Sequence, residues 1–121
     1  MIPSIMICDD SNIARKQLKK VLPEPWKESV KLAQNGEEAL LNLRAEHFDI
    51  LFLDLTMPVL DGFDVLTTMK SEKIQVKTIV ISADIQVEAK NRVEAAGALD
   101  FIKKPVSAEA LTAVLTKHNL I

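Results

Sequence analysis

Five short apolar runs recur along the chain, and the segments between them carry apolar residues at helical spacing. The runs occupy residues 4–8, 30–33, 50–53, 78–81 and 98–102. Most positions within a run are apolar, a pattern typical of strands buried on both faces of a parallel sheet. The intervening segments are long enough for helical crossovers, which are right-handed. The pattern therefore predicts an α/β fold, a doubly wound (βα)5 three-layer sandwich, as a single domain over residues 1–121.

The predicted helices have recognisable apolar faces and start signals. Asn35, Asp61 and Ser107 stand where the second, third and fifth helices would begin, and each has a side chain suited to an N-cap. Gly97 stands where the fourth helix would end. The five faces, in chain order, are Ile13, Leu18, Val21 and Leu22; Leu40, Leu41 and Leu43; Phe63, Leu66 and Met69; Ile85, Ala89, Val93 and Ala96; and Ala110, Leu111, Val114 and Leu115.

Composition and charge narrow the functional classes. The chain has 121 residues, of which 48% are hydrophobic and 26% charged, as in an ordinary globular domain. A net charge of -2 argues against nucleic-acid binding through bulk charge. No apolar stretch approaches the roughly 20 residues of a membrane span, and the N-terminus does not resemble a signal peptide. The single cysteine, Cys8, cannot form an internal disulfide, so a cytoplasmic location is the simplest expectation.

Polar residues follow each apolar run, at the edge of the sheet where open parallel sheets bind ligands. Taken one by one, each has a structural alternative: Asp10 or Ser82 could be a helix N-cap, and Lys104 could be a solvated charge. In chain order the residues after the runs are Asp9, Asp10 and Ser11; Gln34, Asn35 and Gly36; Asp54 and Thr56; Ser82 and Asp84; and Lys103, Lys104 and Pro105.

Three of the acids, Asp9, Asp10 and Asp54, come from two strand ends. Two carboxylates about 4 Å apart repel by roughly 4 kcal/mol at an effective dielectric near 20, so the group requires a positive partner. A hard divalent cation such as Mg²⁺ fits oxygen ligands of this kind. A cation and an ammonium beside a strand-end carboxylate favour phosphoryl transfer, with Asp54 as the acceptor that forms an acyl phosphate.

Four motifs in order then identify a family resemblance that covers essentially the whole chain. They are "CDDS", "LDLTMPVLDG", "VISAD" and "DFIKKP", each at the end of its strand. Together they resemble the response regulator receiver domain, the CheY-like module of two-component signalling. The resemblance implies a parallel five-stranded sheet in the order 2-1-3-4-5 and a cis peptide bond between Lys104 and Pro105.

The resemblance also implies roles for the residues around the acceptor. Asp54 would accept a phosphoryl group from a histidine kinase or a small phosphodonor. Asp10 would bind Mg²⁺ directly and Asp9 mostly through water, with Asp54 and the backbone carbonyl of Thr56 completing the protein ligands. Lys104 would pair with the phosphoryl group.

Five further positions are implied to act in switching and in setting the lifetime of the acyl phosphate. Ser82 would be the switch hydroxyl, and Ala83 would supply a backbone N–H beside it. Phe101 would be the switch aromatic that turns inward when Ser82 moves; lacking a hydroxyl, it must act by packing alone. Thr56 and Asp84 would tune the rate of hydrolysis.

Partners follow from the same resemblance. A histidine kinase or a histidine phosphotransfer domain would approach Ile13, Ala14 and Arg15, although these residues could equally be helix packing and a solvated arginine. A target protein or output domain would read the fourth helix, fifth strand and fifth helix, where Val87 falls off the apolar stripe. Neither direct nucleic-acid binding nor membrane contact is expected.

Two other functions fit the sequence less well. A phosphohydrolase of the haloacid-dehalogenase type also forms an aspartyl phosphate, but it requires an acid two residues after the nucleophile, where this chain has Thr56. A nucleotide-binding domain would need a glycine-rich phosphate loop, which is absent. The expectation is therefore a switch that catalyses only its own phosphorylation and dephosphorylation. The sequence leaves open whether it acts alone or within a longer protein, and which kinase and target it meets.

Overall fold

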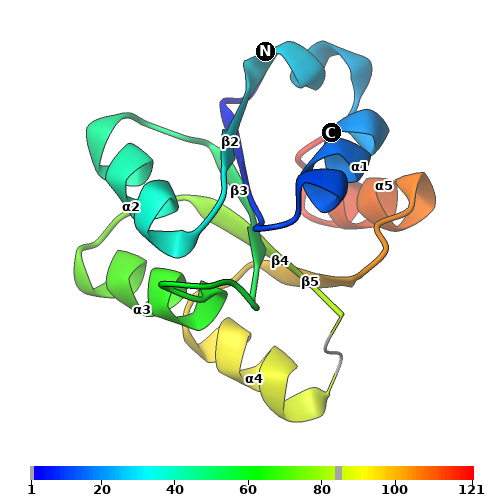
Figure 1. Ribbon diagram of the computed structural model, residues 1–121. Helices are drawn as coiled ribbons and strands as arrows, with labels where there is room; N and C mark the ends of the chain where they lie inside the picture. Colours follow the sequence, from blue (N-terminus) through cyan, green and yellow to red (C-terminus); the bar gives the residue numbers. More distant parts are fainter. Residues whose placement is uncertain (1, 84–85) are drawn as a thin grey trace.

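A computed structural model describes residues 2–83 and 86–121 and contains one five-stranded sheet (Figure 1). All strands are parallel, in the order β2-β1-β3-β4-β5. The α/β fold and the strand order expected from the sequence are confirmed. The strands are β1 (Ile5–Cys8), β2 (Val30–Ala33), β3 (Ile50–Asp54), β4 (Lys77–Ser82) and β5 (Asp100–Lys103).

Helices cover both faces of the sheet, as Figure 1 shows. Helices α1 and α5 pack on one face, whereas α2, α3 and α4 pack on the other, and each face has its own apolar cluster. None of the helices among the described residues has the length and apolar character needed to cross a membrane. The helices are α1 (Asn12–Val21), the short 3-10 helix η1 (Glu24–Ser29), α2 (Gly36–Ala45), α3 (Gly62–Ser71), α4 (Val87–Ala95) and α5 (Ala108–Lys117).

Burial along the strands explains why the apolar runs of the sequence predicted the positions of the strands. Every residue of β1 and β3 is buried, because these strands lie inside the sheet with helices on both faces. The edge strand β2 differs, since Lys31 and Leu32 are exposed. A lysine on an edge strand discourages pairing with another chain. The centre of the sheet is therefore the rigid part of the fold, and it ends at the acidic residues.

The helix starts agree with the expected caps. The side chains of Asn35, Asp61 and Ser107 each accept a hydrogen bond from the backbone N–H three residues later. Ser11 caps α1 in the same way, so the alternative in which Asp10 is the cap is wrong. Ser82 is the last residue of β4, so it is not a cap for α4.

For two residues, the prediction of a place on a buried helix face is wrong. Ile13 is 68% exposed and Leu41 is 67% exposed, because each lies off the side of its helix that faces the sheet. The fifth strand also begins two residues later than expected, at Asp100. Ile85, expected on the face of the fourth helix, lies outside the described residues.

Candidate functional site

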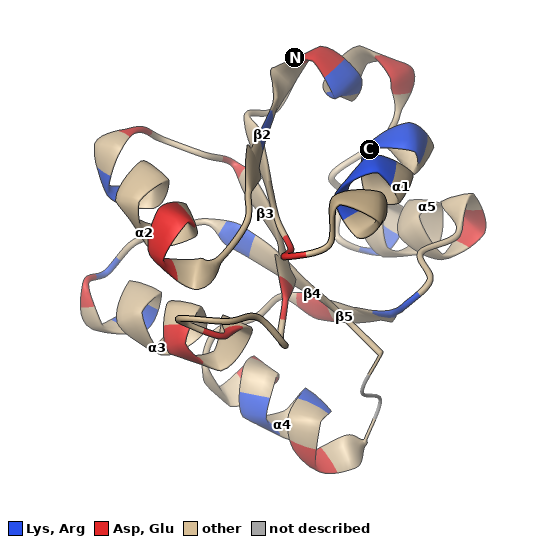
Figure 2. Cartoon of the chain, in the orientation of Figure 1, with Lys and Arg blue, Asp and Glu red and all other residues tan. Residues whose placement is uncertain are grey.

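Three acidic residues meet where β1 and β3 end. Asp9 and Asp10 follow β1 directly, and Asp54 is the last residue of β3. Figure 2 shows acidic segments gathered at the ends of these two strands. One carboxylate oxygen from each residue lies within 4.8 Å of the others. Because β1 and β3 pair in parallel with Cys8 beside Leu53, their ends are level, and the carboxylates are forced together.

A lysine from the fifth strand's end completes the cluster. Lys104 Nζ lies 2.8 Å from Asp9 Oδ2 and 3.4 Å from Asp54 Oδ1. The peptide bond from Lys104 to Pro105 is cis, as the resemblance implied. Asp9 and Asp54 are each 5% exposed, whereas Asp10 is exposed. The site therefore has a buried pair of acids bridged by one ammonium, with a third acid at its solvent side.

The donor set fits a divalent cation. Three carboxylates and one ammonium leave two negative charges in excess, and all the offered ligands are hard oxygens. Asp9 already has partners: its Oδ1 accepts from the backbone N–H of Ser11, and its Oδ2 contacts Lys104. A cation with mixed protein and water ligands, as Mg²⁺ prefers, would find its accessible carboxylate at Asp10.

Burial raises the pKa of the Asp54 carboxyl. The pKa of Asp54 is raised to about 6, because the carboxyl is desolvated and faces the charge of Asp9; Lys104 and the Thr56 backbone N–H oppose this rise. Burial alone would lower the pKa of Lys104, but the two carboxylates outweigh it and the pKa is raised. Asp54 is therefore a poorly solvated anion at neutral pH, beside an ammonium that stays charged.

Cys8 lies at the end of β1 next to this cluster but lacks reactive character. Burial and the neighbouring charges of Asp9 and Asp54 raise the pKa of its thiol to about 12. A thiol with so high a pKa is not ionised at neutral pH and is a poor nucleophile. Its Sγ lies 3.5 Å from Met57 Sδ, so it packs β1 against the loop that follows the acceptor.

Three of the remaining expected site residues, Ser82, Ala83 and Thr56, end or follow strands at the same edge. Ser82 ends β4, is 2% exposed, and its backbone carbonyl accepts a hydrogen bond from the Lys104 N–H. Thr56 and Ala83 are exposed, and Phe101 in β5 is half-buried. Asp84, expected to tune the acyl phosphate lifetime, lies outside the described residues.

The loop between β3 and α3 is held at several points. The N–H of Gly62 donates to Leu55 O, and the N–H of Gly36 donates to Leu60 O. A side chain at Gly62 would collide with the backbone of Asp54 and Leu55, so only glycine allows this close approach. Asp61 and Asp64 form a reciprocal capping box that fixes the start of α3. These contacts position the acceptor strand end.

Arg15 has a structural role that the sequence interpretation missed. The sequence predicted an arginine at a kinase-docking surface or, alternatively, in solvent, yet Arg15 is 7% exposed and its Nη1 donates to the Asp9 backbone carbonyl at 2.6 Å. Its Nη2 contacts Asn12 Oδ1 at 3.3 Å. The position was detectable, because Arg15, Leu18 and Leu22 have the i, i+3, i+7 spacing of one buried helix face.

An apolar hollow of about 280 Å³ opens beside the acceptor. It lies between α1 and the segment that follows β5, with Asp54 and Lys104 at its polar end. Its other lining residues include Ile7, Ala14, Leu18, Phe52, Pro105 and Val106. The site therefore combines a charged centre with an adjoining apolar surface.

Comparisons with known proteins agree with this geometry. The sequence model of a family described as the response regulator receiver domain matches residues 5–116. Chemotaxis protein CheY of Bacillus subtilis is 32% identical over 117 residues, which are 97% of this chain and 98% of that protein. A protein-glutamate methylesterase/protein-glutamine glutaminase of Halalkalibacterium halodurans is 36% identical over 104 residues, which are 84% of this chain. The matched region is only 30% of that methylesterase, so the similarity concerns one part of it.

Solved structures share the fold of the chain. In the CheX-CheY-BeF3-Mg+2 complex from Borrelia burgdorferi, the matching chain has a TM-score of 0.83 and 29% identity, covering 95% of this chain and 87% of that one. Vibrio cholerae chemotaxis protein CheY4 has a TM-score of 0.84 and 26% identity, covering 97% and 98% respectively. The likeness thus extends over nearly the full length of each molecule.

Proposed function

The chain belongs to the response regulator receiver family, and we propose that it is a phosphoacceptor switch of a two-component or phosphorelay system. Asp54 accepts a phosphoryl group from a phosphohistidine of a sensor kinase or phosphotransfer domain. The observation that carries the proposal is the buried Asp54 carboxylate at a strand end, bridged to Asp9 by Lys104. A buried ion cluster without another structural purpose is typical of a reactive site.

The chemistry assigns each residue one task. A carboxylate oxygen of Asp54 forms a bond to phosphorus, while the bond between phosphorus and the donor nitrogen breaks and its electron pair stays on the imidazole. Lys104 neutralises charge on the transferred phosphoryl group. The Ser82 hydroxyl donates a hydrogen bond to one of the phosphoryl oxygens. Mg²⁺, when bound by Asp9, Asp10, Asp54 and the Thr56 carbonyl, supplies further charge neutralisation.

The apolar hollow supports a direction of approach for the donor. Phosphoryl transfer needs the donor imidazole in line with the Asp54 carboxylate, and the hollow opens beside that carboxylate. Ala14 of α1 and Pro105 and Val106 after β5 line it. We assign this surface, together with the exposed Ile13, to the docking of the kinase or phosphotransfer domain. Packing of apolar side chains there would orient the histidine.

The output surface is assigned to α4, β5 and α5. Val87 at the start of α4 is 69% exposed and offers an apolar contact. The half-buried Phe101 of β5 lies beside Val80, two residues before Ser82 on β4, and is the proposed link between this surface and Ser82. A target protein or output domain is the proposed reader, in the cytoplasm, without contact to membrane or nucleic acid. Mg²⁺ is the proposed cofactor.

The phosphohydrolase alternative is less well supported. Such an enzyme would need a general acid two residues beyond Asp54, and Thr56 there has no ionisable group at neutral pH. Thr56 and Asp84 are instead proposed to control the lifetime of the acyl phosphate. Slower or faster dephosphorylation of Thr56→Ala and Asp84→Ala would support this assignment, and unchanged rates in both would remove it.

The central test is phosphorylation by a small donor. The purified chain is incubated with Mg²⁺ and acetyl phosphate or phosphoramidate, and intact mass is measured. We expect one added phosphoryl group in the wild type and none in Asp54→Asn, whose amide keeps the shape but is not a nucleophile. Asp61→Asn, an acid of the following loop, is the matched control and should still be labelled. An unlabelled wild type, or equal labelling of Asp54→Asn, would contradict the proposal.

A further inference from the structure

Helix α4 is lightly held in comparison with its neighbours on the same face. Its only buried residues are the small Ala89 and Val93. Helix α3, in contrast, buries Val65, Leu66 and Met69. The N-cap residue of α4 also makes no side-chain capping hydrogen bond, whereas every other α-helix in the described ranges is capped by a side chain. Small buried area and a missing cap both lower the local stability of a helix.

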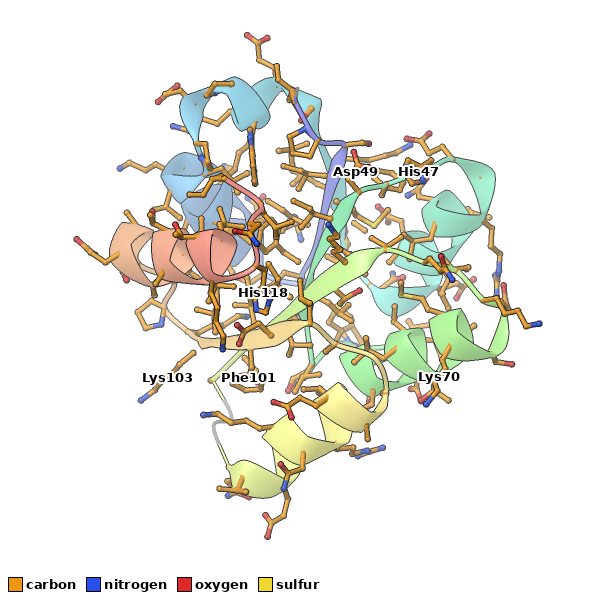
Figure 3. All side chains as sticks on the ribbon, turned by 180° about the vertical axis from the view of Figure 1, so that it is seen from behind. His47, Asp49, Lys70, Phe101, Lys103 and His118 are labelled. Carbon is orange, nitrogen blue, oxygen red and sulfur yellow. The ribbon has the colours of Figure 1, made fainter. Side chains whose placement is uncertain are left out.

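Two cations on α4 contact aromatic rings of neighbouring elements. Lys90 Nζ lies 5.8 Å from the centroid of the Phe101 ring in β5. Arg92 Cζ lies 3.9 Å from the centroid of the Phe63 ring in α3. Figure 3, seen from behind, shows Phe101 on β5 close to α4. These contacts connect the lightly held helix to both of its neighbours.

The Lys90 contact is directed to a ring that is half-buried. Lys90 forms no ion pair with any residue in the ranges 2–83 and 86–121, so its ammonium is not committed to a carboxylate there. A cation within about 6 Å of a ring centroid is attracted to the ring face. Lys90 is exposed, so its ammonium can keep both its hydration and this contact only while the ring face remains reachable from solvent.

We infer that Lys90 is a positioning residue that stabilises Phe101 in its half-exposed place and opposes its burial. This inference rests on the proposed function, in which Phe101 turns inward as Ser82 meets the phosphoryl group. A ring moved into the core would leave the ammonium behind, or would draw it into a medium of low dielectric. Lys90 thereby favours the unphosphorylated arrangement.

The expected contribution of the Lys90–Phe101 contact is large enough to shift the equilibrium between the two positions of Phe101 and too small to prevent the change. Cation–π contacts at exposed sites contribute roughly 0.5–1 kcal/mol, which changes an equilibrium constant about twofold to fivefold. Arg92 is different, because its ring partner Phe63 belongs to α3, whose start is fixed by a capping box. Losing the Arg92 contact would weaken α4 without favouring either position of Phe101.

The test compares four single variants. Lys90→Met keeps the aliphatic length and removes the charge, and Lys90→Arg restores a cation. Arg92→Met removes the other cation–π contact from the same helix. Lys103→Met removes a charge from the same face of β5 as Phe101, two residues away, and controls for general electrostatics. The three substituted positions lie outside the catalytic residues, and all are on the surface.

Beryllofluoride, a phosphoryl mimic, is titrated with Mg²⁺ while the Ser82 and Phe101 amide resonances are followed by NMR. Lys90→Met is expected to reach half-saturation at about two- to fivefold lower beryllofluoride, and Lys90→Arg to match the wild type. Arg92→Met and Lys103→Met should leave half-saturation unchanged. In the free wild type, the ring current of Phe101 should move the Lys90 ε-proton resonances upfield, and saturation with beryllofluoride should abolish this displacement.

Failure of the inference is distinguishable from failure of the proposed function. If the wild type binds beryllofluoride and Lys90→Met has the same half-saturation, the inference is wrong and the proposed function stands. An equal change in Arg92→Met or Lys103→Met would also overturn it, because the effect would then not be specific to Phe101. If the wild type does not respond to beryllofluoride at all, both are wrong.

Discussion

The β3–α3 segment, residues 50–71, and the β4–α4 segment, residues 77–83 and 86–95, share the order strand, loop and helix but are held in different ways. The first has a glycine packed on the strand backbone, a capping box, and a loop bonded back to Gly36 and Leu55. The second has a helix with two small buried side chains and no side-chain cap. The two segments lie next to each other on one face of the sheet.

The difference matches two requirements of the switch proposed above. The acceptor carboxylate must be held in place despite the repulsion of Asp9, so the β3–α3 segment has to be rigid. The surface that reports phosphorylation must move at small cost, so the β4–α4 segment has to be weakly held. Rigidity at Asp54 and weak anchoring at α4 are therefore complementary features of the proposed mechanism.

The largest expected effect is at Gly62. A methyl group in Gly62→Ala would meet the Asp54 carbonyl oxygen and lie 2.8 Å from Leu55 Cα, neither of which can move freely. We expect a loss of about 3 kcal/mol in the free energy of unfolding, measured by urea denaturation. Gly97→Ala, just after α4, is the matched control: it has open space and only the strain of φ +105°, so about 1 kcal/mol is expected. Equal losses at both glycines would contradict the comparison.

The second-largest expected effect concerns the charge of Asp54 in the β3–α3 segment and its influence on stability. The pKa of Asp54 in the folded protein is about 6, above the roughly 3.9 of an unfolded aspartate. The folded state therefore binds the proton more tightly, and its stability falls as the pH rises from about 4 through 6. Without metal at pH 8, Asp54→Asn is expected to be about 2–3 kcal/mol more stable than the wild type, with most of that difference lost at pH 4.

Asp49, which precedes β3, is the control of opposite sign. Its pKa is lowered, chiefly because the backbone N–H of Ser4 and the ring of His47 donate to the carboxylate. Its contribution to stability is present above the pKa of the unfolded group and is lost as the pH falls. Asp49→Asn should therefore be less stable than the wild type at pH 8. An Asp54→Asn protein that is no more stable than the wild type at pH 8 would mean that the acceptor is not strained.

The smallest effect is at the start of α3. Asp61→Ala removes the carboxylate that accepts from the Asp64 N–H and leaves only the other half of the capping box, the bond from the backbone N–H of residue 61 to the Asp64 carboxylate. A loss of about 1–2 kcal/mol is expected from the cap, measured by urea denaturation. Ser107→Ala at the start of α5 removes a single capping bond and should cost no more than about 1 kcal/mol. A larger loss at Ser107 would show that the capping box adds nothing to the β3–α3 segment.

The periodicity of the sequence predicted most of the architecture, because the inner strands are buried along their whole length. β1 and β3 are apolar at almost every position, and this signal does not depend on neighbours. The same pattern indicated that Asp9, Asp10 and Asp54 would meet, since parallel strands end at one edge. Asn35 and Asp61 were identified as caps from local chemistry alone.

Other features could not be predicted from local patterns. Ile13 and Leu41 have helical spacing but face solvent, because the direction in which a helix packs is set by its partners. Val59 has φ 70°, unusual for a β-branched residue, and it lies between Pro58 and Leu60, which are joined by a backbone hydrogen bond of 2.9 Å. Such a conformation is imposed by the contacts on either side of the loop rather than by the residue itself.

The sequence by itself determined the fold class, the polar residues that follow each strand and the acids that meet at one edge. Hydrophobic periodicity and the position of a residue at a strand end can both be recognised in the chain alone. The tertiary structure decided how those residues are used. Three features depend on elements that meet only in the folded chain. They are the bridging of Asp9 and Asp54 by Lys104, the burial of Arg15, and the cation–π contact of Lys90 with Phe101. The distances between these groups, their desolvation and their pKa values depend on such tertiary contacts, which no local sequence pattern predicts.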